Sequence, residues 1–261
     1  MRAAFAGKGG AGKTTTVATL ARLLARRGAP VVAVDADSNP NLAVALGVER
    51  TVAAEIVALP TELVSRRPDG PRLRTPLEAV LADHATEGPD EVRLVAMGQP
   101  DHADSGCLCG AHAVVSALLA DLGERSDTFT LMDLEASPEH LSRGTARHAD
   151  LLVLVAEPYY RSLESVRRMA ALAAELPIAR VVVVANKVRS PDDAEAIGAF
   201  CANHGLPVVA EVPWSAEVLD ADAAGIPLLD AAPDGAVVTA IAGLADHLAG
   251  ITTPLTNTGS R

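Results

Sequence analysis

Residues 7–14 read Gly7-Lys8-Gly9-Gly10-Ala11-Gly12-Lys13-Thr14, which matches the phosphate-loop pattern G-x-x-x-x-G-K-[S/T]. The apolar run Arg2–Phe5 precedes this stretch, and the Ala/Leu-rich amphipathic run Lys13–Arg27 follows it. A strand, a glycine-rich loop and a helix in this order let backbone N–H groups and the helix N-terminus surround phosphate oxygens. The stretch therefore predicts a nucleotide-binding site at the start of an α/β domain.

The rest of the chain alternates short apolar runs with longer amphipathic runs. The short runs are mostly β-branched and bounded by Gly, Pro or Asp, as parallel strands covered on both faces should be. This rhythm predicts an α/β fold, a doubly wound and mostly parallel sheet flanked by helices. We expect strands at Arg2–Phe5, Val31–Val34, Val92–Ala96, Thr130–Met132, Leu151–Val155, Val181–Ala185 and Val208–Glu211. We expect helices at Lys13–Arg27, Val114–Leu122, Pro138–His148, Leu163–Glu175, Pro191–His204, Ala216–Ala224 and Gly235–Leu248.

Domain boundaries follow from the same pattern. We expect residues 1–250 to form one P-loop ATPase domain, and the polar residues 251–261 to be a disordered tail. Proline and charge punctuate Leu59–Pro89, which we interpret as an insertion or mobile surface segment.

Composition narrows the class of protein. Hydrophobic residues make up 49% of the chain but aromatic residues only 2%, which favours a core of Ala, Val and Leu. The net charge of −11 disfavours a nucleic-acid partner. Three cysteines and no signal-like N-terminus favour a cytoplasmic protein with reduced thiols. Because no run reaches the roughly 18 apolar residues of a membrane span, we expect none.

The phosphate loop itself predicts the roles of two side chains. We expect Lys13 to reach the β- and γ-phosphates of ATP, and Thr14 to ligate Mg²⁺. The backbone of the surrounding loop is expected to contact ATP, or ADP after hydrolysis. The residues assigned to this nucleotide contact are Gly9, Gly10, Ala11, Gly12, Lys13, Thr14 and Thr15.

The early lysine of the loop adds a second expectation. The string from Lys8 to Thr15 resembles the deviant phosphate loop of the MinD/ParA/nitrogenase-iron-protein class. In that class the early lysine reaches across a dimer interface to the partner's nucleotide and stabilises charge on the transferring phosphoryl group, as an arginine finger does. The resemblance implies an ATP-dependent homodimer in which Lys8 is catalytic. From Lys8 alone, a solvated loop lysine remains the alternative.

Acidic residues follow two of the expected strands. Val31–Val34 leads into Asp35 and Asp37, and the carboxyl ends of parallel strands face the ligand crevice. The resemblance implies that Asp37 orients the attacking water, while Asp35 lies deeper and supports the loop or the waters of Mg²⁺. Asp133 is the expected second carboxylate, which holds Mg²⁺ through water. The class usually has a glycine, whose backbone contacts the γ-phosphate, where this chain has Ser137, so the chain departs from the class pattern at this contact.

Two further motifs are expected around the base of the nucleotide. In the resembled class, the pair that corresponds to Asn186 and Lys187 shapes the adenine pocket. Pro213 is assigned to the same pocket, and Trp214 either packs near the base or belongs to the core.

A cysteine pair, Cys107 and Cys109, precedes an expected helix. Cysteines one residue apart are poorly placed for a disulfide, whereas two thiolates can share a Zn²⁺ or Ni²⁺ ion. Such an ion needs about four ligands, which a two-fold dimer with one pair from each subunit would supply. Two buried cysteines that pack a helix start are the alternative. Other possible ligands nearby are Asp101, His102, Asp104 and His112.

Longer strings narrow the resemblance to one branch, the CooC-type ATPases that insert nickel during maturation of carbon monoxide dehydrogenase. The resemblance spans Arg2 to Leu248 and implies an ATP-dependent dimer that holds nickel or zinc and acts on a client metalloenzyme such as carbon monoxide dehydrogenase. The alternatives are a MinD/ParA-type ATPase that positions or partitions a cargo, and a redox protein like the nitrogenase iron protein. The strings are residues 35–42, 106–109 and 135–145, and Val212-Pro213 with Asp220-Ala221-Asp222.

Overall fold

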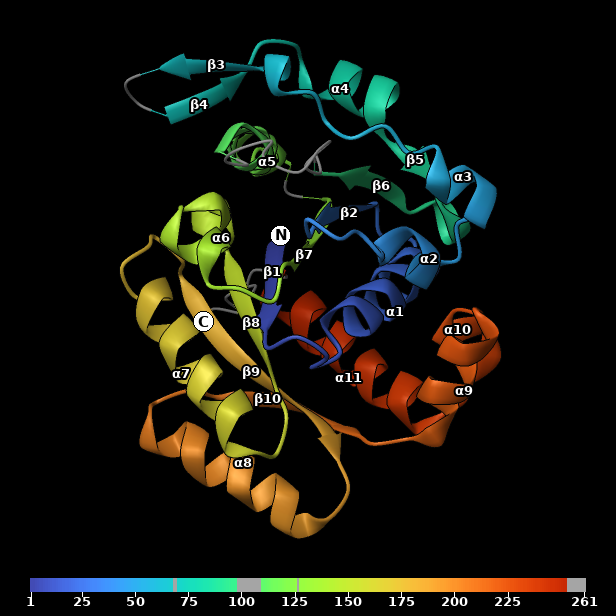
Figure 1. The fold of residues 1–261 in the computed structure, drawn as a ribbon, viewed down its shortest axis with the longest axis vertical. Helices are drawn as coiled ribbons and strands as arrows, with labels where there is room; N and C mark the ends of the chain where they lie inside the picture. Colours follow the sequence, from blue (N-terminus) through green and yellow to red (C-terminus); the bar gives the residue numbers. More distant parts are fainter. Residues whose placement is uncertain (68–69, 98–108, 126, 253–261) are drawn as a thin grey trace, which may run out of the picture.

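The computed structural model describes residues 1–67, 70–97, 109–125 and 127–252, and its centre is a twisted eight-stranded sheet (Figure 1). The strands of this sheet are β1 (Arg2–Gly7), β2 (Val31–Ala36), β5 (Thr86–Glu87), β6 (Arg93–Ala96), β7 (Phe129–Leu134), β8 (Leu151–Ala156), β9 (Arg180–Val188) and β10 (Val208–Pro213). Their order is β10-β9-β8-β1-β7-β2-β6-β5, and every neighbouring pair is parallel except β5 with β6. The predicted doubly wound, mostly parallel sheet is confirmed.

Helices cover both faces of the sheet. Along β1, Ala4 and Ala6 join one hydrophobic cluster, while Ala3 and Phe5 join the other. The first cluster packs α4, α5, α7 and α8 on the sheet, and the second packs α1, α10 and α11 on the opposite face. The helices are α1 (Lys13–Arg26), α2 (Leu42–Leu46), α3 (Arg50–Ala54), α4 (Leu77–His84), α5 (Cys109–Leu122), α6 (Glu139–Ser142), α7 (Tyr160–Ala173), α8 (Pro191–Asn203), α9 (Ala216–Ala224), α10 (Leu228–Ala231) and α11 (Ala236–Thr252), with short 3-10 turns η1 (Thr61–Leu63), η2 (Pro89–Glu91) and η3 (Thr145–His148).

The helix expected over Pro138–His148 is divided in two. Gly144 lies between α6 and η3 with a left-handed φ of 68°, a conformation that glycine adopts without steric cost. The expectation of one continuous helix is therefore wrong. Downstream, α11 includes Ile251, the first residue of the expected tail, and residues 253–261 lie outside the described part of the chain.

The segment Leu59–Pro89 has secondary structure of its own. It contains η1, an antiparallel hairpin of β3 (Val64–Arg67) and β4 (Gly70–Leu73), α4 and β5. The apolar side chains of this segment pack on the first cluster, and the hairpin lies beside α5 in Figure 1. The segment is thus an insertion with secondary structure of its own, which is the first of the two interpretations.

Candidate functional site

The phosphate loop joins β1 to α1 at the carboxyl edge of the sheet, where a doubly wound fold binds its ligands. Gly10 and Gly12 have left-handed φ angles of 79° and 97°, and Gly12 caps the N-terminus of α1. A Cβ atom on Gly12 would collide with the side-chain nitrogen of Asn186. The loop therefore needs glycine at residue 12 for both its backbone angle and its space.

Two side chains from the end of β9 hold this loop. Asn186 is buried, and its Nδ2 donates to the carbonyl oxygen of Ala11 at 2.6 Å. The Nζ atom of Lys187 donates to the carbonyl oxygen of Gly10 at 2.5 Å and pairs with Glu157 at 2.8 Å. The predicted pair thus lies at the site and contacts the loop directly, in addition to lining a cavity.

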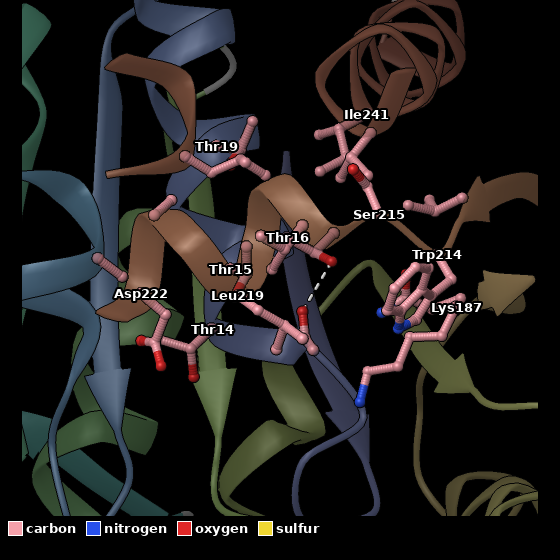
Figure 2. Close-up of a pocket in the computed structure, with 18 of the residues that line it drawn as sticks. Thr14, Thr15, Thr16, Thr19, Lys187, Trp214, Ser215, Leu219, Asp222 and Ile241 are labelled. Atoms are coloured by element: carbon pink, nitrogen blue, oxygen red, sulfur yellow. Dashed lines mark hydrogen bonds between the residues drawn. The ribbon is translucent and has the colours of Figure 1, made fainter. Parts of the chain in front are cut away.

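That cavity, with a volume of about 370 Å³, lies between α1, the ends of β9 and β10, and α9. Figure 2 shows Thr14, Lys187 and Trp214 around it, with Leu219 of α9. Trp214 is 40% exposed, and the Arg189 guanidinium lies 5.3 Å from the centre of its ring. Trp214 is therefore not a core residue. Pro213 also lines the cavity, whose size lies within the range of small-molecule sites.

Two carboxyl groups lie buried side by side where β2 and β7 end. Asp35 and Asp133 are register partners on these strands, and each is at most 2% exposed. Burial raises the pKa of Asp35 to about 6, although it accepts backbone N–H groups from Leu42 and Asp37. Burial likewise raises the pKa of Asp133 to about 7, although the hydrogen bond from Thr14 lowers this pKa. Because Asp35 accepts the backbone N–H groups of Asp37 and Leu42, it supports the loop that follows β2.

The oxygen atoms of Thr14 and Asp133 fit a Mg²⁺ site. The Thr14 hydroxyl donates to Oδ2 of Asp133 at 2.6 Å. The other oxygen, Oδ1, is buried and has no hydrogen-bond partner among the described residues. A buried polar atom without a partner is costly, and hard oxygen ligands and their waters are what Mg²⁺ prefers.

The two other predicted catalytic groups lie at the same edge. Lys13 is only 6% exposed, and burial lowers the pKa of its ammonium group, while Asp133, Asp37 and Glu135 act in the opposite direction. Asp37 is half-buried, and its Oδ1 accepts the backbone N–H of Asn39 at 2.9 Å. Lys13 thus lies among acidic side chains, at a place where its ammonium group could also contact a bound phosphate group.

Lys8 lies on the ring of Tyr159, with Nζ 5.6 Å from the ring centre. The Tyr159 hydroxyl donates to Glu157 at 2.6 Å, and Glu157 also pairs with Lys187. Sequence reasoning missed Tyr159 and Glu157. The rarity of lysine was an available signal for the residues that contact these two. The chain has three lysines among its 22 basic residues, at positions 8, 13 and 187, and all three lie at this site.

The cysteine pair is described in part. Cys107 lies outside the described residues, and Cys109 begins α5, where it accepts a 3.1 Å hydrogen bond from Nη1 of Arg143. Cys109 is disulfide-bonded in the structure, which contradicts the expectation of a reduced thiol. Because a disulfide sulfur has no thiolate charge to give a metal, ligation by Cys109 requires its reduction first.

The alternative ligands for a metal are not assembled. His112 is buried and shares a 2.9 Å hydrogen bond with Thr145, while Asp101, His102 and Asp104 lie outside the described residues. Within the described part of the chain, no group of three or more His, Cys, Asp or Glu side chains is placed to hold a metal. A metal site built by one subunit alone is therefore not supported by these residues.

A comparison with protein families decides the class. The CbiA profile, described as the CobQ/CobB/MinD/ParA nucleotide binding domain, matches residues 3–228. The chain belongs to this family. The resemblance to the MinD/ParA class that the loop around Lys8 predicts is therefore confirmed.

Two known proteins are similar to this chain over most of their length. The carbon monoxide dehydrogenase accessory protein CooC of Rhodospirillum rubrum is 37% identical over 246 residues, which are 89% of this chain and 91% of that protein. An uncharacterised ATP-binding protein of Methanocaldococcus jannaschii is 35% identical over 87% of this chain and 91% of its own. The resemblance to CooC is thus confirmed at the level of sequence.

Solved structures of family members share the fold. The septum site-determining protein MinD of Pyrococcus horikoshii, complexed with Mg-ADP, matches 98% of this chain and 100% of its own with a TM-score of 0.70. Its sequence identity is 21%, so this likeness shows the fold alone. Among the described residues, no helix is both long and apolar enough to cross a membrane.

Proposed function

We propose that this protein is a dimeric metallochaperone-type ATPase, which hydrolyses ATP to load nickel, or another metal, into a client metalloenzyme such as carbon monoxide dehydrogenase. Similarity to CooC over 89% of the chain supports the client class. The observation that carries the coupling is the contact of Arg143 with Cys109. Arg143 follows Asp133 by ten residues, so one short segment links the nucleotide site to the cysteine end of α5.

In the ATPase step, the backbone of residues 9–15 and the Lys13 ammonium group hold the phosphates. Asp37 orients a water molecule toward the γ-phosphorus, the bond to the ADP oxygen breaks, and ADP and phosphate leave. Thr14 and Asp133 would hold Mg²⁺, which when bound neutralises phosphate charge. Lys8 reaches the nucleotide of the second subunit, so turnover requires two copies of the chain.

The cargo site needs two subunits as well. Cys107 and Cys109 from each copy would give four thiolates around a two-fold axis, a set that suits Ni²⁺ or Zn²⁺. The cysteines must be in the reduced state to ligate the metal, which fits a cytoplasmic protein. ATP binding closes the dimer and tightens this site, and hydrolysis opens it and releases the metal to the client. In this proposal residues 1–250 act as one domain.

A MinD- or ParA-type role in positioning a cargo is favoured by the shared fold. Against it, α11 carries no Lys or Arg, whereas an amphipathic helix that binds a membrane surface is rich in them. Sedimentation with anionic vesicles in the presence of ATP separates the two roles, because the metallochaperone should stay in the supernatant.

The proposal is tested by metal analysis of the reduced, purified protein after incubation with Ni²⁺ or Zn²⁺, with and without ATP. We expect one metal ion per dimer, more tightly held with ATP, in the wild type. Cys109→Ser should abolish this binding. Cys201→Ala is the matched control, because Cys201 is a free, buried cysteine of α8, away from the proposed site. Undiminished metal binding by Cys109→Ser would contradict the proposal.

A further inference from the structure

A closed set of contacts begins and ends on the phosphate loop. Lys8 lies on the Tyr159 ring, the Tyr159 hydroxyl donates to Oε2 of Glu157, and Oε1 of Glu157 pairs with Lys187. Lys187 returns to the loop through the carbonyl oxygen of Gly10. The backbone N–H of Tyr159 also donates to the carbonyl oxygen of Glu157 at 2.8 Å. Both ends of the Tyr159 residue, its backbone and its hydroxyl, are thus fixed to Glu157.

The contacts between Tyr159 and Glu157 are held in place because Glu157 is buried. Glu157 is 7% exposed, and its backbone N–H donates to Ser162 in the first turn of α7 at 2.9 Å. Burial, together with the hydrogen bond to Glu157, raises the pKa of Tyr159 to about 12, so the phenol stays protonated and remains a donor. Tyr159 itself is 40% exposed. The ring is therefore a fixed surface that is open to solvent on one side.

A cation held on an aromatic face is held weakly enough to leave. The geometry points to Tyr159 as a positioning residue that retains Lys8 within its own subunit, a contact that Lys8 must give up before it reaches the nucleotide of a second copy. The first half of this inference is that Tyr159 retains Lys8. The second half, that Lys8 must leave Tyr159 when the dimer forms, rests on the proposed function. At an exposed site, a cation–π contact favours the bound lysine by about two- to fivefold. Because each of the two subunits gives up one such contact, the dimer is disfavoured by the square of this factor, about four- to twenty-fivefold.

The neighbouring Tyr160 supplies a matched control. It is the other tyrosine of the chain, it is 74% exposed at the start of α7, and the contacts described above do not include it. Tyr160→Leu removes an exposed ring from the same surface without touching the Lys8 contact. A difference between Tyr159→Leu and Tyr160→Leu thus reports on Lys8 and not on the general loss of aromatic surface.

The first half of the inference is tested on the nucleotide-free monomer. An amine-reactive ester is added briefly, and mass spectrometry measures the acylation of Lys8. We expect Tyr159→Leu to raise this rate about two- to fivefold, and Tyr159→Phe, which keeps the ring, to raise it less. Tyr160→Leu should match the wild type. Tyr159→Ser also removes the ring and replaces the Leu variant if that variant does not fold. Equal Lys8 acylation in the wild type and the ring-free variants would overturn the inference.

The second half is tested by the dissociation constant of the dimer with a non-hydrolysable ATP analogue. Tyr159→Leu should tighten the dimer about four- to twenty-fivefold, because both subunits lose the contact, whereas Tyr160→Leu should not. A weaker or unchanged dimer in Tyr159→Leu, beside a wild type that dimerises, would overturn this half. If the wild type does not dimerise at all, the proposed function fails, while the acylation result still decides whether Tyr159 holds Lys8.

Discussion

The Thr14 hydroxyl donates a 2.6 Å hydrogen bond to Oδ2 of Asp133, which ties the first turn of α1 to the end of β7. The bond joins the phosphate loop to a carboxyl group that follows it by 119 residues. It leaves Oδ1 of Asp133 buried without a partner among the described residues, next to the carboxyl group of Asp35. The nucleotide-free site is therefore one where negative charge is costly.

Replacing Asp133 by Asn should change how stability depends on pH. Burial raises the pKa of Asp133 to about 7, so between about pH 4 and pH 7 the folded protein keeps a proton that the unfolded chain has released. The unfolding free energy contributed by this group falls as pH rises through that window, and Asn has no such dependence. Asp133→Asn should therefore become more stable relative to the wild type as pH rises, by on the order of a few kcal/mol at about pH 8.

Urea unfolding of both nucleotide-free proteins at several pH values measures this difference. Taking the difference removes the effect of His140, whose pKa burial lowers to about 4 and whose contribution has the opposite sign. A difference that stays constant or shrinks as pH rises would show that Asp133 is charged in the folded protein at neutral pH.

Alanine at Gly12 and at Gly10 should have unequal effects on nucleotide binding. Both glycines have positive φ, so each alanine carries a backbone cost of roughly 1–2 kcal/mol. Only a Cβ at Gly12 displaces Asn186 and its bond to Ala11, because a Cβ at Gly10 meets no described atom within 4 Å. Isothermal titration with ATP should show affinity lower by about tenfold or more in Gly12→Ala than in Gly10→Ala, which corresponds to about 1.4 kcal/mol. Equal losses would mean that Asn186 does not support the loop.

Arg22 should matter more to stability than Arg26, although both are on α1 and both contact Asp90 and Asp230. The Arg22 side chain is 5% exposed and that of Arg26 is 41% exposed. Arg22→Met removes the buried partner of Asp90 and Asp230 and leaves the more exposed Arg26 to pair with both, so it should cost about 1–3 kcal/mol. Arg26→Met keeps the buried Arg22 contacts and should cost about 0–1 kcal/mol. Denaturant unfolding of the two variants compares these costs, and similar losses would contradict a role for burial.

Trp214 should report nucleotide binding directly, because it is the one tryptophan of the chain and lines the cavity beside the phosphate loop. Its 40% exposed ring should lose water contact when ATP enters, so the fluorescence emission should shift to shorter wavelength. The shift should follow the binding isotherm measured by calorimetry. Binding without any spectral change would place the base elsewhere.

Local patterns predicted the centre of the fold better than its edges. The strand, loop and helix around Gly12 follow from glycine spacing and from the apolar runs on either side. The β3–β4 hairpin packs on α5, a contact between segments far apart in the sequence that no local pattern reports. The contact of Lys8 with Tyr159 joins residues 151 positions apart, and no periodicity reports it. The loop string around Lys8 and the rarity of lysine both point to Lys8 itself, but neither identifies Tyr159 as the residue that it contacts.

Subunit complementation tests the ATP-gated dimer most directly. Lys8→Ala has an intact Asp37 but lacks the lysine that acts on the partner, and Asp37→Ala has the lysine but cannot orient water. Each variant alone should have lost nearly all ATP turnover. Mixed in equal amounts, they should recover about a quarter of the wild-type rate, because about half the dimers pair unlike subunits and each of these has one complete site. A mixture no more active than its components would contradict a lysine that acts across the dimer.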